Sequence, residues 1–358
     1  MGDELGNLEG AVKKEWPALI SGVGGITALI GLCVTVGGGI TWLVNHHRQE
    51  MERQARIALA QAQDQQADYA GAIATYDDIL KADSLYKPAL DGQLAAAMHW
   101  VEDFHVIGAR TDDDVAPMAA KEIDQIMPVL ETGLARTKGT QMADVEAHVG
   151  WAHWLNQQIA EREFGPAAEQ NLRAALSLDP NNVYANAMLG NLTLMNHGSV
   201  ADAMRLFDVA VATGNARPFV RRLELGGLRY LDEKGARAAQ VKVANDMRKG
   251  GEPLDEDYKS RILSFCFDPV VTHRDELVES LSAVPADDAW KTYLWLDDKG
   301  SSDYQEEVRE FIHANLLELS GDKAGSLAMF RTLQAELKDN NGDMKDQVDA
   351  AVARLSHG

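Results

Sequence analysis

Small and large apolar residues recur at helical spacing in the middle of the chain. The same order appears twice, 35 residues apart: Ala168, Leu172 and Ala175, then Ala203, Phe207 and Ala210. These steps of four and three residues place the side chains on one face of an α-helix. The sequence Asp-Pro-Asn-Asn at 179–182 predicts the end of the first helix, because the residue before proline avoids helical conformations and asparagine suits turns.

The same pattern recurs nearer the amino terminus. Asp68 precedes a stretch in which Ala72 and Tyr76 repeat the small-to-large spacing. Residues 45–64, rich in Gln, Ala and Arg, predict the helix that comes before it. Each unit would therefore consist of two helices joined by a short turn.

Between and after these units the pattern is weaker. Residues 88–137 predict two or three amphipathic helices around a loop at 108–114, and they fit the repeat less well. A weaker third copy covers about 217–248, where Leu225 and Gly226 occupy the positions of Leu189 and Gly190.

The sequence Lys-Gly-Gly-Glu-Pro at 249–253 is the strongest internal break. We therefore expect a repeat region at 45–250 and a carboxyl-terminal helical region at 251–358. The second region ends in a half-repeat followed by a helix near 342–356 that would cap the stack. The half-repeat is carried by Gly321, Asp322, Ser326, Phe330 and Leu333.

These residues resemble the tetratricopeptide repeat, a helix-turn-helix unit of 34 residues. Its pattern is Leu-Gly, then Ala and Phe four residues apart, then Pro. Leu189-Gly190, Ala203 and Phe207 match the first part, and Pro180 closes the preceding unit. One such unit cannot bury its apolar face alone, so the resemblance implies an all-α fold in which repeats stack into an α-solenoid. The first helix of each repeat would line a concave face.

The amino terminus predicts a membrane anchor. Residues 1–17 form a short polar tail, and residues 18–44 contain no charged side chain. About 20 such residues suffice to cross a bilayer, and the stretch is too long for the core of a signal peptide. We expect a single transmembrane helix at 18–44; the alternative is a buried helix of a soluble protein.

Small residues form a seam within that span, at steps of 3, 4, 3, 4 and 3: Ser21, Gly24, Ala28, Gly31, Thr35 and Gly38. Small residues on one helix face allow close helix packing in membranes. The seam thus predicts pairing with a second copy or with another protein's transmembrane helix, although glycine is also simply frequent in membrane helices. Basic residues flank the span almost equally, so charge alone leaves its orientation open.

A single amino-terminal span that continues into these repeats resembles the bacterial inner-membrane family that includes the ancillary subunit of the Sec translocon. The resemblance covers the architecture of roughly residues 10–90. It implies a scaffold in the bacterial inner membrane that assists protein export or envelope quality control. We favour a periplasmic soluble domain over a cytoplasmic one.

Composition narrows the classes of function. The formal net charge of −21 disfavours nucleic acid as a partner, because phosphate binding needs clustered Lys and Arg. Two cysteines, Cys33 and Cys266, lie in unrelated surroundings, so we expect no disulfide. Neither His-Glu-x-x-His, Gly-x-Ser-x-Gly nor a phosphate-binding Gly-rich loop occurs. We therefore expect no catalytic, cofactor or metal site.

Candidate binding residues lie in the clearest repeats. Trp151 and Trp154, together with His148 and His153, would offer an aromatic anchor for a peptide, or else fill the core. Asn186 and Asn191 occupy the helix that contacts peptides in members of the resembled family. The basic run Arg217, Arg221 and Arg222 would bind a carboxylate, or else pair with Glu224.

These observations favour a noncatalytic scaffold or adaptor that binds proteins through a groove containing Trp151, Trp154, Asn186, Asn191 and Arg222. The expected partners are other proteins of a membrane complex and the lipid bilayer, with a homo-oligomer as a further possibility. The alternative is an accessory structural subunit of a large membrane assembly, held mainly by its transmembrane seam. Substitutions in the groove would disable the adaptor, whereas Gly24→Leu or Gly31→Leu would disable the subunit.

Overall fold

The computed structural model describes residues 45–104, 115–160, 167–213, 218–228, 231, 235–270, 272–298, 303–337 and 342–357. In these ranges the backbone is helical or forms turns, without strands, which confirms the predicted all-α class for this part of the chain. The predicted anchor at 18–44 and its seam lie outside them. None of the described helices is long and apolar enough to cross a membrane.

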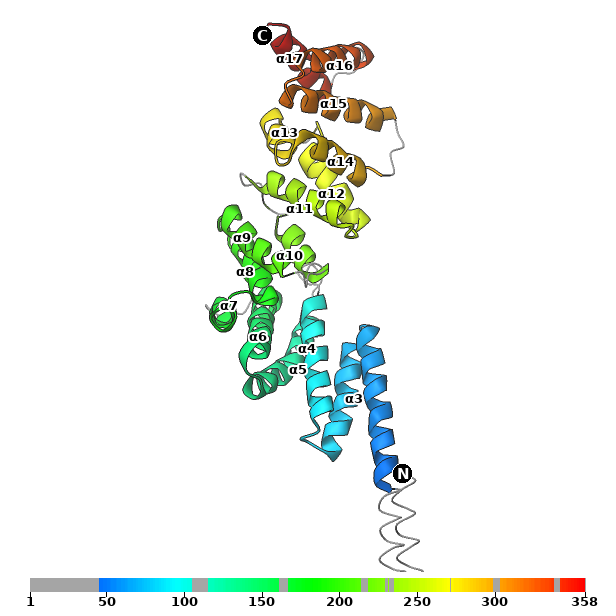
Figure 1. Ribbon diagram of the computed structural model, residues 1–358, viewed down its shortest axis with the longest axis vertical. Coiled ribbons are helices and arrows are strands. Elements are labelled where there is room, and N and C mark those ends of the chain that lie inside the picture. The colour runs from blue at the N-terminus through cyan, green and yellow to red at the C-terminus, as the bar shows by residue number, and fades with distance from the viewer. Residues whose placement is uncertain are drawn as a thin grey trace, which may run out of the picture. The chain divides into compact units, whose positions relative to one another are not determined.

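The chain divides into two compact units, and the division falls after Trp100. The first unit contains a helix at 45–65, α3 (Tyr69–Ala82) and most of α4 (Lys87–Asp103) (Figure 1). In this unit Tyr69 of α3 stacks on Trp100 of α4, with ring centroids 6.4 Å apart. The predicted helix at 45–64 is confirmed.

The second unit holds the remaining helices, which follow one another in chain order in Figure 1. They are α5 (Val115–Arg136), α6 (Gly139–Ala160), α7 (Ala167–Leu178), α8 (Val183–Met195), α9 (Val200–Ala212), α10 (Pro218–Leu228), α11 (Ala236–Gly250), α12 (Glu256–Phe267), α13 (Arg274–Leu281), α14 (Ala286–Leu296), α15 (Asp303–Leu319), α16 (Lys323–Glu336) and α17 (Asp343–Ser356).

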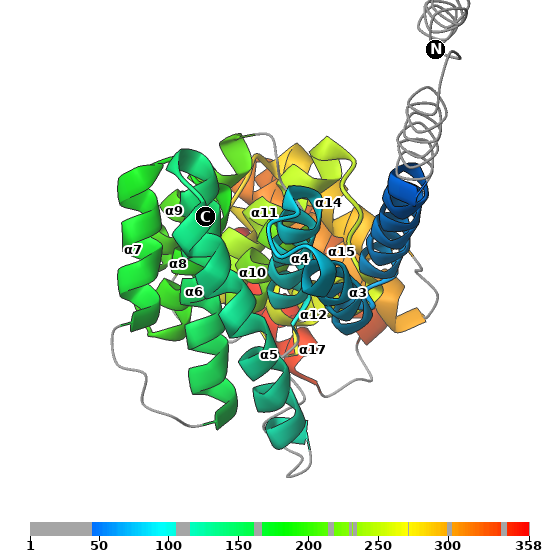
Figure 2. The same ribbon diagram turned by 90° about the horizontal axis from the view of Figure 1, so that it is seen from below.

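The helices of this unit pack mainly on close neighbours in the chain. The most extensive contacts join α6 to α7, α8 to α9, α15 to α16, and α5 to α6. A second set of contacts joins helices that are two apart in the chain, such as α6 with α8 and α8 with α10. Helix α7 lies against both α6 and α8 (Figure 2). Paired helices whose contacts stay local along the sequence are the packing expected of stacked helical repeats.

Three helices, α3, α9 and α16, share one pattern of capping and packing. Each begins after a side-chain oxygen that accepts a hydrogen bond from the backbone N–H three residues later, which satisfies a free donor at the helix start. Four residues after the cap lies a buried small residue, and eight residues after it a buried aromatic ring. The three sets are Asp68, Ala72 and Tyr76; Ser199, Ala203 and Phe207; and Asp322, Ser326 and Phe330.

Gly190 allows α8 and α9 to approach closely, as its position after Leu189 predicts. A Cβ atom at Gly190 would lie 3.0–3.2 Å from three carbon atoms of the Phe207 ring. Gly150 has the same role in the preceding pair, where a Cβ would lie 3.0 Å from the carbonyl oxygen of Ala168. The same Cβ would lie 3.2 Å from the side chain of Leu172, so in both pairs a glycine of the first helix faces a large side chain of the second.

In the third predicted repeat, which contains α10 and α11, the glycine in close contact is one residue later than predicted. A Cβ at Gly226 would meet the hydroxyl of Tyr258 at an ordinary 3.8 Å, whereas one at Gly227 would lie 2.7 Å from Leu194 of α8. The close approach at α10 is thus to α8, the first helix of the preceding pair. The equivalence of Leu225-Gly226 to Leu189-Gly190 does not hold in the structure.

The predicted break at 249–253 is the end of a helix. Gly251 ends α11 in the left-handed conformation, with φ of 65°, which glycine adopts without strain. The hydrophobic core nevertheless continues past this point, from Ala187 in α8 to Ala351 in α17. The described helices that follow Gly251 therefore share a core with α8 to α11.

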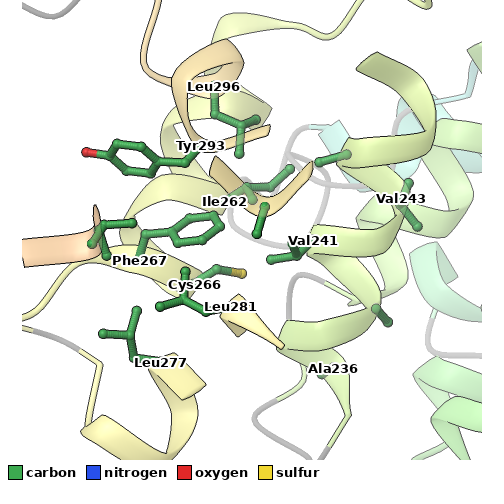
Figure 3. Close-up of a cluster of buried hydrophobic side chains, with 14 of the residues drawn as sticks. Ala236, Val241, Val243, Ile262, Cys266, Phe267, Leu277, Leu281, Tyr293 and Leu296 are labelled. Atoms are coloured by element: carbon green, nitrogen blue, oxygen red, sulfur yellow. The ribbon is translucent and has the colours of Figure 1, made fainter. Parts of the chain in front are cut away.

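Cys266 lies in this continuous core, among side chains of α11 to α14 (Figure 3). Phe267 and Tyr293 meet edge to face beside it, with centroids 5.5 Å apart. The thiol is fully buried, and burial raises the pKa of Cys266 to about 12.

The pKa of Cys266 predicts an unreactive thiol. A rise from 9.0 to about 12 lowers the thiolate fraction roughly a thousandfold at neutral pH. In a Cys33→Ser variant, alkylation by iodoacetamide should therefore be at least about a thousandfold slower in the folded protein than in urea. Mass spectrometry of the labelled peptide measures both rates. Similar rates in the two states would contradict the closed core around α12.

Candidate functional site

The two predicted tryptophans form a packed pair on α6. Trp151 and Trp154 are 3% and 8% exposed, and their rings stack with centroids 4.3 Å apart. This geometry favours the alternative in which they fill the core. Their role as an aromatic anchor for a partner stays a prediction, and it would require α6 to rearrange.

The two predicted asparagines are also buried, and their amides are bound within the chain. Asn186 Nδ2 donates to the backbone carbonyls of Pro180, at 3.1 Å, and Asn182, at 2.8 Å. Asn191 Nδ2 donates to the carbonyl of Leu223, at 2.8 Å, and so ties α8 to α10. Buried amides with such partners stabilise the repeat stack, and a contact with a partner stays a prediction.

His148 is fully buried beside the tryptophans. Its Nε2 lies 3.0 Å from Oε1 of Glu102, and its Nδ1 lies 2.6 Å from the backbone carbonyl of Asp144. His153 is half-buried, and burial lowers its pKa. In the described part of the chain, no three His, Cys, Asp or Glu side chains are close enough together to hold a metal ion.

Arg222, the fifth predicted residue, is partly exposed. Its Nη2 donates to Oδ1 of Asp103, at 2.9 Å, and to the carbonyl of Glu102, at 3.1 Å. Arg217, which belongs to the same basic run, lies outside the described residues. Arg222 also lines an open pocket in the second unit, whereas the other four predicted groove residues do not line that pocket.

This pocket has a volume of about 570 Å³, within the usual range of ligand sites. We call it the α10 pocket, because α10 contributes four of its lining residues. Seven of its side chains are apolar or aromatic. The lining consists of Val211 from α9, Pro218, Arg221, Arg222 and Leu225 from α10, Met247 from α11, residues 252–255 and Tyr258 from α12.

The apolar side chains differ in depth. Leu225 and Met247 are each 3% exposed and form the deeper part of the pocket, whereas Val211, Leu254 and Tyr258 are half-buried. A second pocket of about 430 Å³ shares Leu225 and Tyr258 with the first. An apolar side chain from a partner would find room in either pocket.

Arg221 forms a buried ion cluster in the wall of the α10 pocket. Its Nη1 lies 2.7 Å from Glu224, and its Nε and Nη2 lie 3.0 and 3.1 Å from the two carboxylate oxygens of Glu252. Burial opposes its charge, but the hydrogen bonds to Glu252 and the charge of Glu224 outweigh burial and raise the pKa of Arg221. Burial raises the pKa of Glu224, and Arg221 offsets part of that rise.

These pairings decide between the two interpretations of the basic run. Arg221 pairs with Glu224, as the second alternative predicts, and Arg222 pairs with Asp103. Both arginines that line the α10 pocket therefore already hold carboxylates of this chain. Their charges favour a rigid wall over a site for a partner's carboxylate.

Most of the α10 pocket lies outside the residues that the sequence pattern predicts as binding residues. Leu254 and Tyr258 lie after the break at 249–253, whereas Val211 lies before it, on α9. These side chains meet only because four successive helices, α9 to α12, stack on one another, and no local sequence pattern predicts that stacking. The signal present in the sequence is the Gly-Gly-Glu-Pro turn, which places four consecutive lining residues after α11.

Comparisons with known proteins do not assign the chain to a family. No protein-family model matches the chain, and a search of curated proteins finds no significant match. The structure alone defines the class of the described part, an all-helical protein of locally paired helices with an apolar pocket beside α10.

Proposed function

We propose that this chain is a noncatalytic, membrane-anchored scaffold of tetratricopeptide-like repeats, which binds an apolar segment of a partner protein in the α10 pocket. The observation that carries the proposal is this pocket, with apolar side chains from four helices and the 252–255 turn. The partner would belong to a complex in the bacterial inner membrane.

The repeat pattern supports the scaffold part of the proposal. Capped helices with a small residue and an aromatic ring at fixed spacing occur in both compact units. Gly150 brings α6 and α7 together in the same way as Gly190 brings α8 and α9 together. Stacked helical repeats offer extended surfaces for protein partners.

The chemistry of the α10 pocket supports an apolar ligand. Its two arginines are held by acidic residues of the same chain, so the remaining contact surface is mainly that of Leu225, Met247, Leu254 and Tyr258. Apolar anchors from a peptide commonly fill such pockets on helical surfaces.

The membrane location rests on the sequence. The uncharged stretch at 18–44 is followed at residue 45 by the first described helix, so the soluble part would begin at the membrane surface. The resemblance to the ancillary Sec-translocon family supports a periplasmic orientation and a role in protein export or envelope quality control.

Photocrosslinking tests binding in the α10 pocket. Benzoylphenylalanine at the exposed Pro253 should give a defined adduct in native membranes, and sequencing should place it on an apolar or amphipathic partner segment. Adding Leu254→Glu should lower the adduct yield about tenfold, since a carboxylate in an apolar pocket costs at least about 1.4 kcal/mol of binding.

Leu294→Glu is the matched control, because Leu294 is 38% exposed on α14 and outside the α10 pocket. It should leave the adduct unchanged, and both variants should keep their helical circular dichroism. An adduct that survives Leu254→Glu at full yield would show that the α10 pocket does not bind the partner.

A further inference from the structure

An apolar stripe runs along the outer face of the helix at 45–65. Met51 and Leu59 are 61% and 55% exposed, and the alanines at 55 and 58 are exposed as well. Met51, Ala55, Ala58 and Ala62 follow steps of four, three and four residues, with Leu59 beside them. We call these five residues the 51–62 stripe.

The opposite face of this helix packs on the rest of the first unit. Ile57 and Ala60 are buried there, at 8% and 0% exposure. Gln63 accepts a hydrogen bond from Thr75 of α3 at 2.8 Å, and Asp64 lies 3.0 Å from Nδ1 of His99 in α4. These contacts fix the rotation of the helix about its axis, so the 51–62 stripe faces away from α3 and α4.

The spacing of the stripe is that of a coiled-coil seam, in which apolar residues alternate at steps of three and four. In a parallel pair of these helices, Met51 and Ala58 would occupy one seam position and Ala55 and Ala62 the other. Alanine lets the backbones approach closely. The side chain of His47 would then lie beside Glu52 of the second copy, a polar pairing at the edge of the seam.

Charge within the seam does not oppose the pairing. Arg48 precedes Met51 on the same face, and its Nε lies 3.2 Å from Oε1 of Glu52 in its own chain. This ion pair offsets the repulsion that two arginines at one level would otherwise cause.

The length of the stripe indicates what kind of partner it suits. At 1.5 Å per residue it covers about 17 Å of helix, and its five residues are far fewer than the roughly 20–30 residues on each side of a stable standard interface. Such a short seam needs a second tether that holds the two helices parallel and level. The proposed anchor ends at residue 44, directly before this helix, and would supply that tether to two copies in one membrane.

We infer that the 51–62 stripe binds the same stripe of a second copy, in a parallel helix pair at the membrane surface. The inference rests on the membrane anchor of the proposed function and is independent of the α10 pocket. The soluble part alone would remain monomeric, because the stripe is too short to hold a dimer in water.

Disulfide crosslinking of the full chain in lipid nanodiscs tests the inference. In a Cys33→Ser background, which retains the buried Cys266, single cysteines replace Ala55 or Ala58 on the stripe. Gln49→Cys and Arg56→Cys are matched controls, because both side chains are exposed but point away from the stripe. Under mild oxidation, dimer yields at 55 and 58 should exceed those at 49 and 56 at least about fivefold, since a disulfide requires Cβ atoms within about 4.5 Å.

Two results would overturn the inference. Equal yields at all four positions would mean that the copies meet without this helix face, and the absence of dimer at 55 and 58 would mean that they do not pair there. Adding Met51→Glu and Leu59→Glu should reduce the yield at 58 to the level of the controls. Photocrosslinking from Pro253 in native membranes reports the α10 pocket separately, and retention of the chain in the nanodiscs reports the anchor. Failure of the inference is therefore distinguishable from failure of the proposed function.

Discussion

Replacing Phe207 with alanine should lower the free energy of unfolding by about 3–5 kcal/mol, the usual cost of removing a fully buried aromatic ring. The ring of Phe207 is 0% exposed and fills the space that Gly190 leaves between α8 and α9. Because α8 also packs on α6 and α10, the cavity would weaken three neighbouring helix contacts.

Urea denaturation of the full chain in mild detergent, followed by far-ultraviolet circular dichroism, measures this loss. Leu178→Ala is the matched control, because Leu178 is 46% exposed at the end of α7 and its truncation should cost less than about 1 kcal/mol. A Phe207→Ala variant as stable as the control would contradict the packing of the central pair.

Replacing Gly190 with alanine should lower the free energy of unfolding by about 1–2 kcal/mol, against the usual direction of this substitution. Alanine in place of a helical glycine normally stabilises a protein by about 0.5–1 kcal/mol. At Gly190, however, the added methyl group would lie 3.0–3.2 Å from carbon atoms of Phe207, a ring enclosed on all sides. Either α8 or the ring must move.

Gly226→Ala provides the control within the same unit. Its added methyl group would meet Tyr258 at 3.8 Å, so the ordinary gain of about 0.5–1 kcal/mol should appear. In a Phe207→Leu background the cost of Gly190→Ala should fall by about 1 kcal/mol, because the smaller side chain relieves the contact. Equal effects at Gly190 and Gly226 would contradict the close approach of α8 and α9.

The apolar periodicity predicts the helix pairs well. Ala203, Phe207 and Ala210 are all buried on one face of α9, as their spacing requires. The turn at 179–182 ends α7 at Leu178, and Asn182 then caps α8 by accepting a hydrogen bond from the N–H of Ala185. These features are local, so the sequence states them directly.

Polar residues inside the stack are harder to assign. Asn186 and Asn191 are polar residues on the first helix of a repeat, where binding residues are expected. Their amides are nevertheless bound to carbonyls of this chain. Whether an amide on a helix faces a partner or a neighbouring helix depends on the rotation of the two helices. The rotation of α10 likewise decides that Gly227, and not Gly226, lies in close contact with α8.

The division into units and the α10 pocket depend on packing between elements distant in the sequence. Gly251 ends a helix as the Gly-Gly pair predicts, yet the core continues across it to α17. The α10 pocket joins side chains from four helices and a turn, and only their stacking brings them together.

Copurification with and without the anchor tests the central claim most directly. The full chain, a form lacking residues 1–44 and the full-length Leu254→Glu variant are each isolated in mild detergent, and bound proteins are identified by mass spectrometry. We expect the partner to remain with the form lacking the anchor and to be lost from Leu254→Glu. If the partner is lost with the anchor while the shortened protein keeps its helical circular dichroism, the seam at 18–44 holds the complex, and the chain is the accessory structural subunit.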